Sequence, residues 1–157
     1  MNKPTSLQNL CLFRKGNQLL LAMKKRGFGV GRWNGYGGKV NLGETIEESL
    51  KREIGEESGM ELEEFRKIGL MRFENVDKMV EVHIFEATSW KGEPVETEEM
   101  APAWFALENI PFSEMWPSDP LWYPYYFGGK SFVGDVVFDK DYRVLSSEIR
   151  EANLLPA

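Results

Sequence analysis

The sequence is poor in cysteine and histidine and has no long apolar run. Its single cysteine, Cys11, excludes an intrachain disulfide, and the apolar run around it predicts a buried strand residue. The single histidine, His83, falls in an alternating pattern and is interpreted as a strand-surface or cross-strand residue rather than a catalyst. Without an 18-residue apolar stretch or a signal-peptide pattern, we expect no membrane partner and a cytoplasmic location, with an organelle left open.

The chain also lacks an excess of positive charge. Its net charge is -6 and its pI is about 5.0, which disfavours a nucleic acid polymer as the main ligand. A small anion can still bind where metal ions and a few Lys or Arg side chains neutralise it. The length of 157 residues predicts one domain over residues 1–157, and nothing in the sequence indicates more than a monomer.

Hydrophobic periodicity predicts an α/β domain. Thr45 and Glu48 form a capping box that starts a helix, and Gly59 ends it. An aromatic-rich segment at 112–127 is expected to be partly helical, and the six glycines within 26–38 predict a loop that approaches a ligand closely. Strands are expected at 7–13, 17–23, 65–73, 79–88, 103–107, 132–138 and 142–149. This order favours an α/β/α sandwich around a mixed central sheet.

The helix carries the strongest chemical signal. Glu53, Glu56 and Glu57 are spaced to share one helix face, where like charges repel. A divalent cation among them would offset that repulsion, and oxygen ligands suit Mg²⁺, Mn²⁺ or Ca²⁺ better than zinc. A solvated Glu-rich face is the plain alternative.

The glutamates belong to a longer pattern that resembles the Nudix box. Its fixed positions here are Gly38, Glu44, Arg52-Glu53-Ile54, Glu56-Glu57 and Gly59-Met60. The resemblance implies a Nudix fold and metal-assisted hydrolysis of a diphosphate linkage, with Mg²⁺ as cofactor and Mn²⁺ able to replace it. By position it implies that Arg52 orients the carboxylates and that Glu56, with Glu53 next, is the base. The metal ligands that it implies are Gly37, Glu53, Glu56, Glu57 and Glu99.

Further segments resemble the vertebrate MutT-homologue branch of the family, the oxidised purine nucleoside triphosphatases. These segments are 23–29, 31–35, 94–96, 99–100, 110–112 and 115–117. The resemblance implies a small nucleoside triphosphate, 8-oxo-dGTP or 2-hydroxy-dATP, as substrate. Aromatic and apolar side chains suit a stacked base, and Asn, Asp and Lys suit its edge and the phosphates. The expected substrate-binding residues are Asn9, Lys24, Phe28, Asn34, Gly37, Gly38, Phe73, Met100, Trp116, Ser118 and Asp119.

The chain departs from that branch at one position. Two adjacent aspartates follow Trp-Pro in the family, whereas this chain has Ser118-Asp119. Ser118 can hydrogen-bond but carries no charge, so we expect a reduced or shifted range of oxidised bases. Three alternatives stay open: a Nudix hydrolase for another nucleotide, sugar nucleotide or RNA 5′ end, a non-catalytic nucleotide-binding module, and an interaction protein.

Overall fold

The computed structural model describes residues 3–153 and 155, and in these ranges nine strands form one sheet. The strands are β1 Thr5–Lys15, β2 Gln18–Lys24, β3 Trp33–Asn34, β4 Tyr36–Lys39, β5 Glu61–Glu74, β6 Met79–Lys91, β7 Met100–Ala106, β8 Phe132–Phe138 and β9 Val144–Glu151. The main order is β3-β2-β1-β6-β5-β8-β9, with β4 paired to β1 and β7 paired to β2. The pairs β1–β6 and β5–β8 are parallel and the others antiparallel, so the sheet is mixed, as expected.

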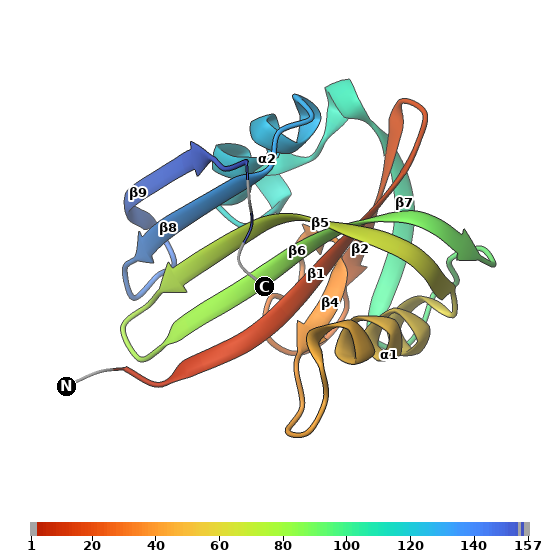
Figure 1. Cartoon of the computed structure of the whole chain (residues 1–157), viewed down its shortest axis with the longest axis horizontal. Helices are drawn as coiled ribbons and strands as arrows, with labels where there is room; N and C mark the ends of the chain where they lie inside the picture. Colours follow the sequence, from red (N-terminus) through yellow and green to blue (C-terminus); the bar gives the residue numbers. More distant parts are fainter. Residues whose placement is uncertain (1–2, 154, 156–157) are drawn as a thin grey trace.

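Two helices pack against this sheet: α1 Ile46–Ser58 lies beside β4, and α2 Asp119–Phe127 lies beside β8 (Figure 1). Two short 3₁₀ turns, η1 Leu107–Asn109 and η2 Phe112–Glu114, lead from β7 toward α2. The capping box at Thr45 and Glu48 is present, and Gly59 ends α1 with a left-handed backbone, φ 76°. The local signals in the sequence therefore set both ends of α1.

Alternation along the strands divides the core between the two faces of the sheet. In β1, Leu10 and Leu12 join the cluster that contains Trp122 and Tyr126 of α2. Cys11 between them joins the cluster that contains Leu50 of α1. Each fully buried aliphatic side chain contributes about 1.5–3 kcal/mol of hydrophobic stabilisation. The expected sandwich with a helix on each face is confirmed.

Some local expectations need correction. The glycine-rich segment 26–38 is not a loop throughout, because β3 and most of β4 lie within it and pair with β2 and β1. Of the two placements expected for His83, the strand surface is wrong, because the residue is 2% exposed and its Nε2 lies 3.0 Å from a Glu81 carboxylate oxygen. The cross-strand placement is confirmed, because His83 lies opposite Asn9 of β1 and Leu70 of β5. The pairing of 26–38 and the burial of His83 both depend on which strands lie alongside. The local sequence around each does not encode that. Cys11 is fully buried, as expected.

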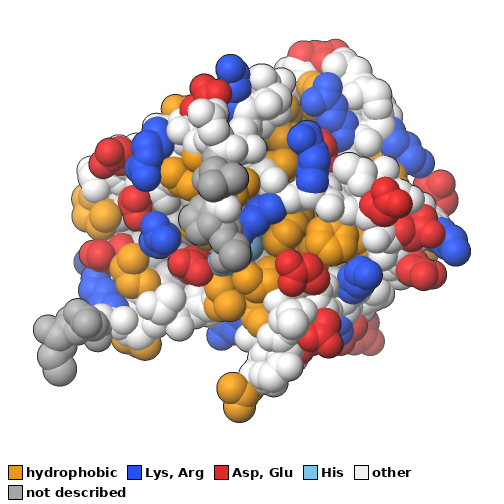
Figure 2. All heavy atoms as spheres, in the orientation of Figure 1, with side chains coloured by type: hydrophobic (Ala, Val, Ile, Leu, Met, Phe, Trp, Pro, Cys, Tyr) orange, Lys and Arg blue, Asp and Glu red, His pale blue; other side chains and the backbone are white. Residues whose placement is uncertain are grey.

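The face shown in Figure 2 carries Lys and Arg side chains interspersed with Asp and Glu. No broad basic tract crosses that face. None of the helices in the described ranges has the length and apolarity that crossing a bilayer requires.

Candidate active site

Arg52 of α1 forms hydrogen bonds with three carboxylates, those of Glu44, Glu53 and Glu56. Its Nε and Nη2 donate to the two oxygens of Glu44 at 2.6 and 3.0 Å. Its Nη1 donates to Glu53 at 3.0 Å and to Glu56 at 3.2 Å, one helical turn further on. Paired charge-assisted hydrogen bonds of this kind fix side-chain direction as well as adding energy. Arg52 thus orients Glu53 and Glu56, and Glu44 holds Arg52.

Glu57 is the most deeply buried carboxylate of the group, with 4% exposure. Its Oε1 accepts from the Gly37 N–H at 3.0 Å. Burial, reinforced by the nearby Glu53 and Glu99 charges, raises the pKa of Glu57 to about 8. Burial likewise raises the pKa of Glu53, with Arg52 opposing the shift. Two desolvated carboxylates that repel each other form an environment that a cation would stabilise.

The glycine turn lets the helix carboxylates approach the sheet. A Cβ on Gly38 would lie 2.7 Å from the carboxylate carbon of Glu53, and one on Gly37 would lie 2.1 Å from the Asn9 carbonyl oxygen. Asn9, 3% exposed, accepts from the Gly38 N–H at 3.2 Å and donates to Ser49 of α1 at 2.9 Å. Asn9 therefore ties β1, β4 and α1 together beside Glu53.

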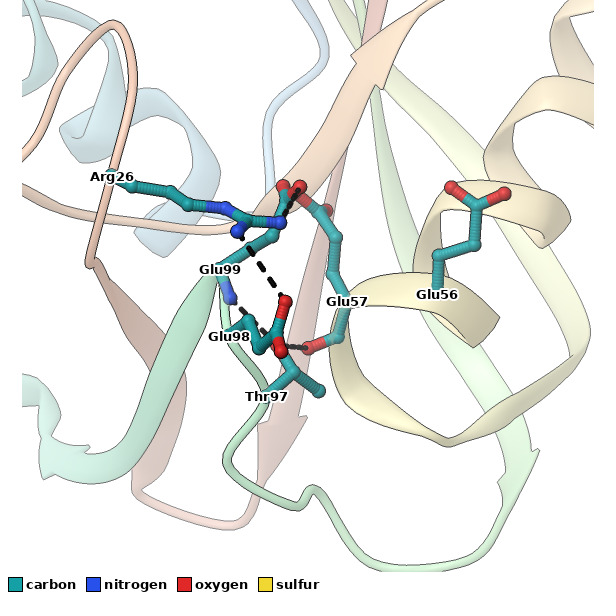
Figure 3. A pocket seen from close by; sticks show the side chains of 6 residues that line it. All are labelled: Arg26, Glu56, Glu57, Thr97, Glu98 and Glu99. Atoms are coloured by element: carbon teal, nitrogen blue, oxygen red, sulfur yellow. Dashed lines mark hydrogen bonds and ion pairs between the residues drawn. The ribbon is translucent and has the colours of Figure 1, made fainter.

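A pocket lies beside α1, and its wall opposite the helix comes from the end of β2 and the segment before β7. Lys24 lies 3.8 Å from Glu99, and Arg26 lies 3.3 Å from Glu99 and 3.4 Å from Glu98. A pocket of about 290 Å³ lies between this wall and α1. Figure 3 shows the Arg26 guanidinium bonded to the Glu98 and Glu99 carboxylates, while Glu56 projects separately from the helix. The pocket is lined by Arg26, Glu56, Glu57, Thr97, Glu98 and Glu99.

The carboxylates are not already gathered as a ligand cage. Over the described ranges, no three Asp, Glu, His or Cys side chains stand in metal-binding geometry. Salt bridges hold them apart, because Glu53 and Glu56 pair with Arg52 while Glu99 pairs with Lys24 and Arg26. The set nevertheless fits a hard divalent cation, since it consists of oxygen donors and two of them are desolvated without a fully matching positive charge. The expected contribution of the Gly37 carbonyl stays a prediction.

A second group of candidate residues surrounds Trp116. The ring centroids of Phe28 and Trp116 are 5.1 Å apart, and the Arg32 guanidinium lies 4.4 Å from the Trp116 ring centre. Arg32 also donates to the Met115 carbonyl at 2.8 Å. Phe28 is 68% exposed although it is aromatic. An exposed ring beside a tryptophan suits a flat ligand that covers both.

The expected polar residues of the base pocket stand at the start of α2, beside Trp116, and on β3. Asp119 is 5% exposed and accepts from the Trp116 N–H and the Trp122 indole N–H, both at 3.2 Å. Burial raises the pKa of Asp119 to about 7. Ser118 is 2% exposed and makes no side-chain capping bond. The Asn34 oxygen accepts from Gly35 at 2.8 Å, so its NH₂ group is the part left for a ligand.

The other two expected base-pocket residues, Phe73 and Met100, pack in the two core clusters. Phe73 lies on β5 and stacks on Phe138, with centroids 5.8 Å apart, in the α2-side cluster. Met100 is 3% exposed and packs in the α1-side cluster, so the structure does not bring it to the aromatic group. The side on which a strand residue faces depends on register, and the sequence of 99–107 left that open.

Sequence reasoning did not single out Arg26, Arg32 or Tyr142. Arg26 and Arg32 stand in the segment 23–35 that was already of interest, so their positive charge was the available signal. Tyr142 lies in the turn between β8 and β9, far along the chain from Phe28 and Trp116. Its ring contacts both of them, and only the fold reveals that contact.

The chain is similar to known proteins in sequence and in fold. The family model of the NUDIX domain matches residues 7–126. The oxidized purine nucleoside triphosphate hydrolase of Mus musculus is 46% identical over 149 residues, 94% of this chain and 96% of that protein. The protein of the same name from Danio rerio is 48% identical over 132 residues, 83% and 85% of the two chains. The crystal structure of a MutT protein from Bacillus halodurans superposes with a TM-score of 0.79 at 23% identity, covering 92% of this chain and 97% of that one.

Proposed function

Since this chain belongs to the NUDIX family of hydrolases, we propose that it hydrolyses oxidised purine nucleoside triphosphates, such as 8-oxo-dGTP, to the monophosphate and pyrophosphate. The relatives from mouse and zebrafish carry that activity in their names, and the alignments extend over most of each chain. Removing such nucleotides would keep damaged bases out of the pool used for DNA synthesis.

The observation that carries the proposal is the complete Arg52–carboxylate network. A binding module without catalysis has no need to keep three carboxylates at the cost of their mutual repulsion. Here Glu53, Glu56 and Glu57 are all present, and Arg52 holds two of them. This favours an enzyme over the nucleotide-binding module and over the pure interaction protein.

We propose that Glu53, Glu56, Glu57 and Glu99 bind a divalent cation, with Mg²⁺ first and Mn²⁺ as a substitute. NUDIX hydrolases generally need a divalent metal. When bound, such an ion neutralises charge on phosphate oxygens and lowers the pKa of a coordinated water. Lys24 and Arg26 place further positive charge at the same pocket, where they can meet a triphosphate.

Glu56 suits the role of base. Its side chain is 61% exposed, it lines the pocket, and Arg52 fixes its direction at 3.2 Å. A base must reach the water it deprotonates, and an oriented carboxylate at the pocket rim meets that geometric requirement. Glu53, which is 17% exposed and bound to the same arginine, is the second candidate.

The aromatic group supplies the base-binding end. Trp116 and Phe28 offer π faces, and base–aromatic stacking is worth about 1–3 kcal/mol per base. Asp119, with a pKa near 7, can be either acceptor or donor around neutral pH, and the Asn34 NH₂ group can donate. This chain has Ser118-Asp119 where the related enzymes have two aspartates. We propose that it therefore accepts a narrower or shifted range of oxidised bases. A monomeric state and a cytoplasmic location stay predictions.

The test is pyrophosphate release from 8-oxo-dGTP and from dGTP, with Mg²⁺ or with a chelator. We expect Mg²⁺-dependent turnover that favours the oxidised nucleotide. Glu56→Gln should lower kcat by about 10²- to 10⁴-fold, the usual contribution of a general base. Glu47→Gln is the matched control, because Glu47 is an exposed carboxylate in the first turn of the same helix.

Each alternative predicts a different result. Mg²⁺-dependent turnover without preference for the oxidised base would keep the hydrolase and discard the substrate. Absence of turnover on a wider set, including sugar nucleotides and capped RNA, would favour a binding module. An equal loss in Glu47→Gln would show that the Glu56 effect is not local.

A further inference from the structure

Three aromatic rings from distant parts of the chain form a triangle. The ring centroids of Phe28 and Trp116 are 5.1 Å apart, those of Phe28 and Tyr142 are 5.4 Å apart, and those of Trp116 and Tyr142 are 5.5 Å apart. Two of the three rings stand on the segments that resemble base-binding segments. The third, Tyr142, lies beyond residue 126, where the family match ends.

The Tyr142 backbone is unusual. Its φ is +60°, and among the described residues it is the one non-glycine with a positive φ. Left-handed backbone favours glycine or asparagine and is disfavoured for a bulky side chain. A tyrosine persists in such a position when the surrounding structure holds it there, and such residues cluster at functional sites.

The turn around Tyr142 is built to hold that conformation. Asp139 accepts from the Asp141 and Arg143 N–H groups at 2.8 and 2.9 Å through one carboxylate oxygen. The Asp139 carbonyl accepts from the Tyr142 N–H at 3.1 Å. The ring is half-buried and also lies 5.8 Å from Phe138, centroid to centroid. The turn therefore directs the Tyr142 ring toward Trp116 and Phe28.

Phe28 is the most exposed ring of the triangle. It is 68% exposed and stands between Gly27 and Gly29, which both have positive φ values. A Cβ on Gly29 would lie in ordinary van der Waals contact with the Trp116 ring, at 3.4 Å, so this segment lies against the tryptophan. A flat ligand that stacks on Trp116 would bury the exposed Phe28 ring and meet the edge of Tyr142.

We propose that Tyr142 is a base-binding residue that, with Trp116 and Phe28, forms a three-ring pocket for the purine of the substrate. This inference rests on the proposed function and extends its binding site to a turn that neither the sequence motifs nor the family match includes. Tyr142 acts by ring contact, so its hydroxyl is dispensable.

The test is calorimetric binding of 8-oxo-dGMP, dGMP and dAMP to the whole chain. In Tyr142→Gly, which removes the ring and accommodates the left-handed backbone, the Kd should rise about three- to tenfold, the range that corresponds to one aromatic contact. Tyr142→Phe should stay within about twofold of wild type, because it keeps the ring. Leu145→Ala, at a 65% exposed apolar residue of β9, is the matched control and should leave the Kd unchanged.

Two further readouts separate base binding from a structural role. The Kd for inorganic pyrophosphate with Mg²⁺ should be the same in wild type and Tyr142→Gly. The thermal unfolding midpoint of Tyr142→Gly should not fall in proportion to its loss of affinity for the purine monophosphates. An unchanged Kd for the purine monophosphates, or an equal loss for pyrophosphate, would overturn the inference. If wild type binds the monophosphates but does not hydrolyse 8-oxo-dGTP, the proposed function fails and the role of Tyr142 is still decided by the Kd values.

Discussion

Replacing Asp119 by asparagine should make the protein more stable at alkaline pH and less active. Asp119 is 5% exposed, and its two oxygens accept from the Trp116 N–H and the Trp122 indole N–H. Burial raises its pKa from 3.8 to about 7, against the opposing effect of these two bonds and of Arg32. At alkaline pH the folded protein therefore carries a buried charge that asparagine lacks.

The magnitude follows from the two pKa values. One pKa unit corresponds to about 1.4 kcal/mol, so the change from 3.8 to about 7 costs the ionised folded state about 4 kcal/mol. Asparagine keeps one acceptor oxygen and places an NH₂ group where the second was, and losing one hydrogen bond costs about 1 kcal/mol. Asp119→Asn should be more stable than wild type by about 3 kcal/mol above pH 8 and less stable by about 1 kcal/mol near pH 4.

The sign of the pH dependence is set by the direction of the shift. A carboxyl group whose pKa is raised on folding contributes its full stabilisation below the unfolded pKa, and that contribution is lost as the pH rises through the folded pKa. Wild type should therefore lose stability between about pH 4 and pH 7 relative to Asp119→Asn. Urea unfolding of both proteins at intervals from pH 4 to pH 9 measures this difference directly.

A difference in unfolding free energy that stays constant over this pH range would refute the reasoning, because it would mean that Asp119 titrates alike in both states. Asp135→Asn, at an exposed carboxylate on β8, controls for the loss of one negative charge. Steady-state kinetics on 8-oxo-dGTP should show a higher KM for Asp119→Asn, since the buried group would then no longer switch between acceptor and donor.

Two other changes test the remaining parts of the site. Gly38→Ala should fold normally but lose about 100-fold in kcat, because a Cβ 2.7 Å from the Glu53 carboxylate displaces that side chain and a shift of about 1 Å has this effect on catalysis. Gly55→Ala, where a Cβ meets nothing within 4 Å, should keep full activity and gain about 1 kcal/mol in urea unfolding, so a similar kcat loss there would contradict the argument. Wild type should differ by about tenfold or more in kcat/KM between 8-oxo-dGTP and 2-hydroxy-dATP, and Ser118→Asp should narrow the gap, since a hydrogen bond to a charged group is worth about 1.5–3 kcal/mol. Equal and high efficiency of wild type on both substrates would oppose this.

The helix and the grouping of Arg52 with its carboxylates could be predicted from the sequence because they depend on local spacing. Thr45, Glu48 and Gly59 set the ends of α1, and the spacing of Arg52 and Glu56 puts them one turn apart. Neighbours within one helix need no knowledge of the rest of the chain. The alternation of apolar residues in the same way predicted strands and a sheet covered on both faces.

The other wall of the pocket depends on pairing across the chain. Lys24 and Arg26 meet Glu99 because β2 runs antiparallel to β7, with Lys24 opposite Met100. The sequence marked Glu99 as a candidate ligand but gave no reason for it to lie beside two cations. The same register buries Met100 on the α1 side, and its expected place in the base pocket stays a prediction.

Burial, and with it protonation, was also decided only by the tertiary structure. The sequence shows Glu57 and Asp119 as ordinary carboxylates, and folding removes both from water and raises the pKa of each toward neutrality. Tyr142 reaches Trp116 and Phe28 only because β8 pairs with β5 and the following turn returns toward the site. The sequence by itself therefore determined which groups are candidates for the chemistry. The long-range strand pairing determined their neighbours, because contact and desolvation arise between segments that are remote along the chain.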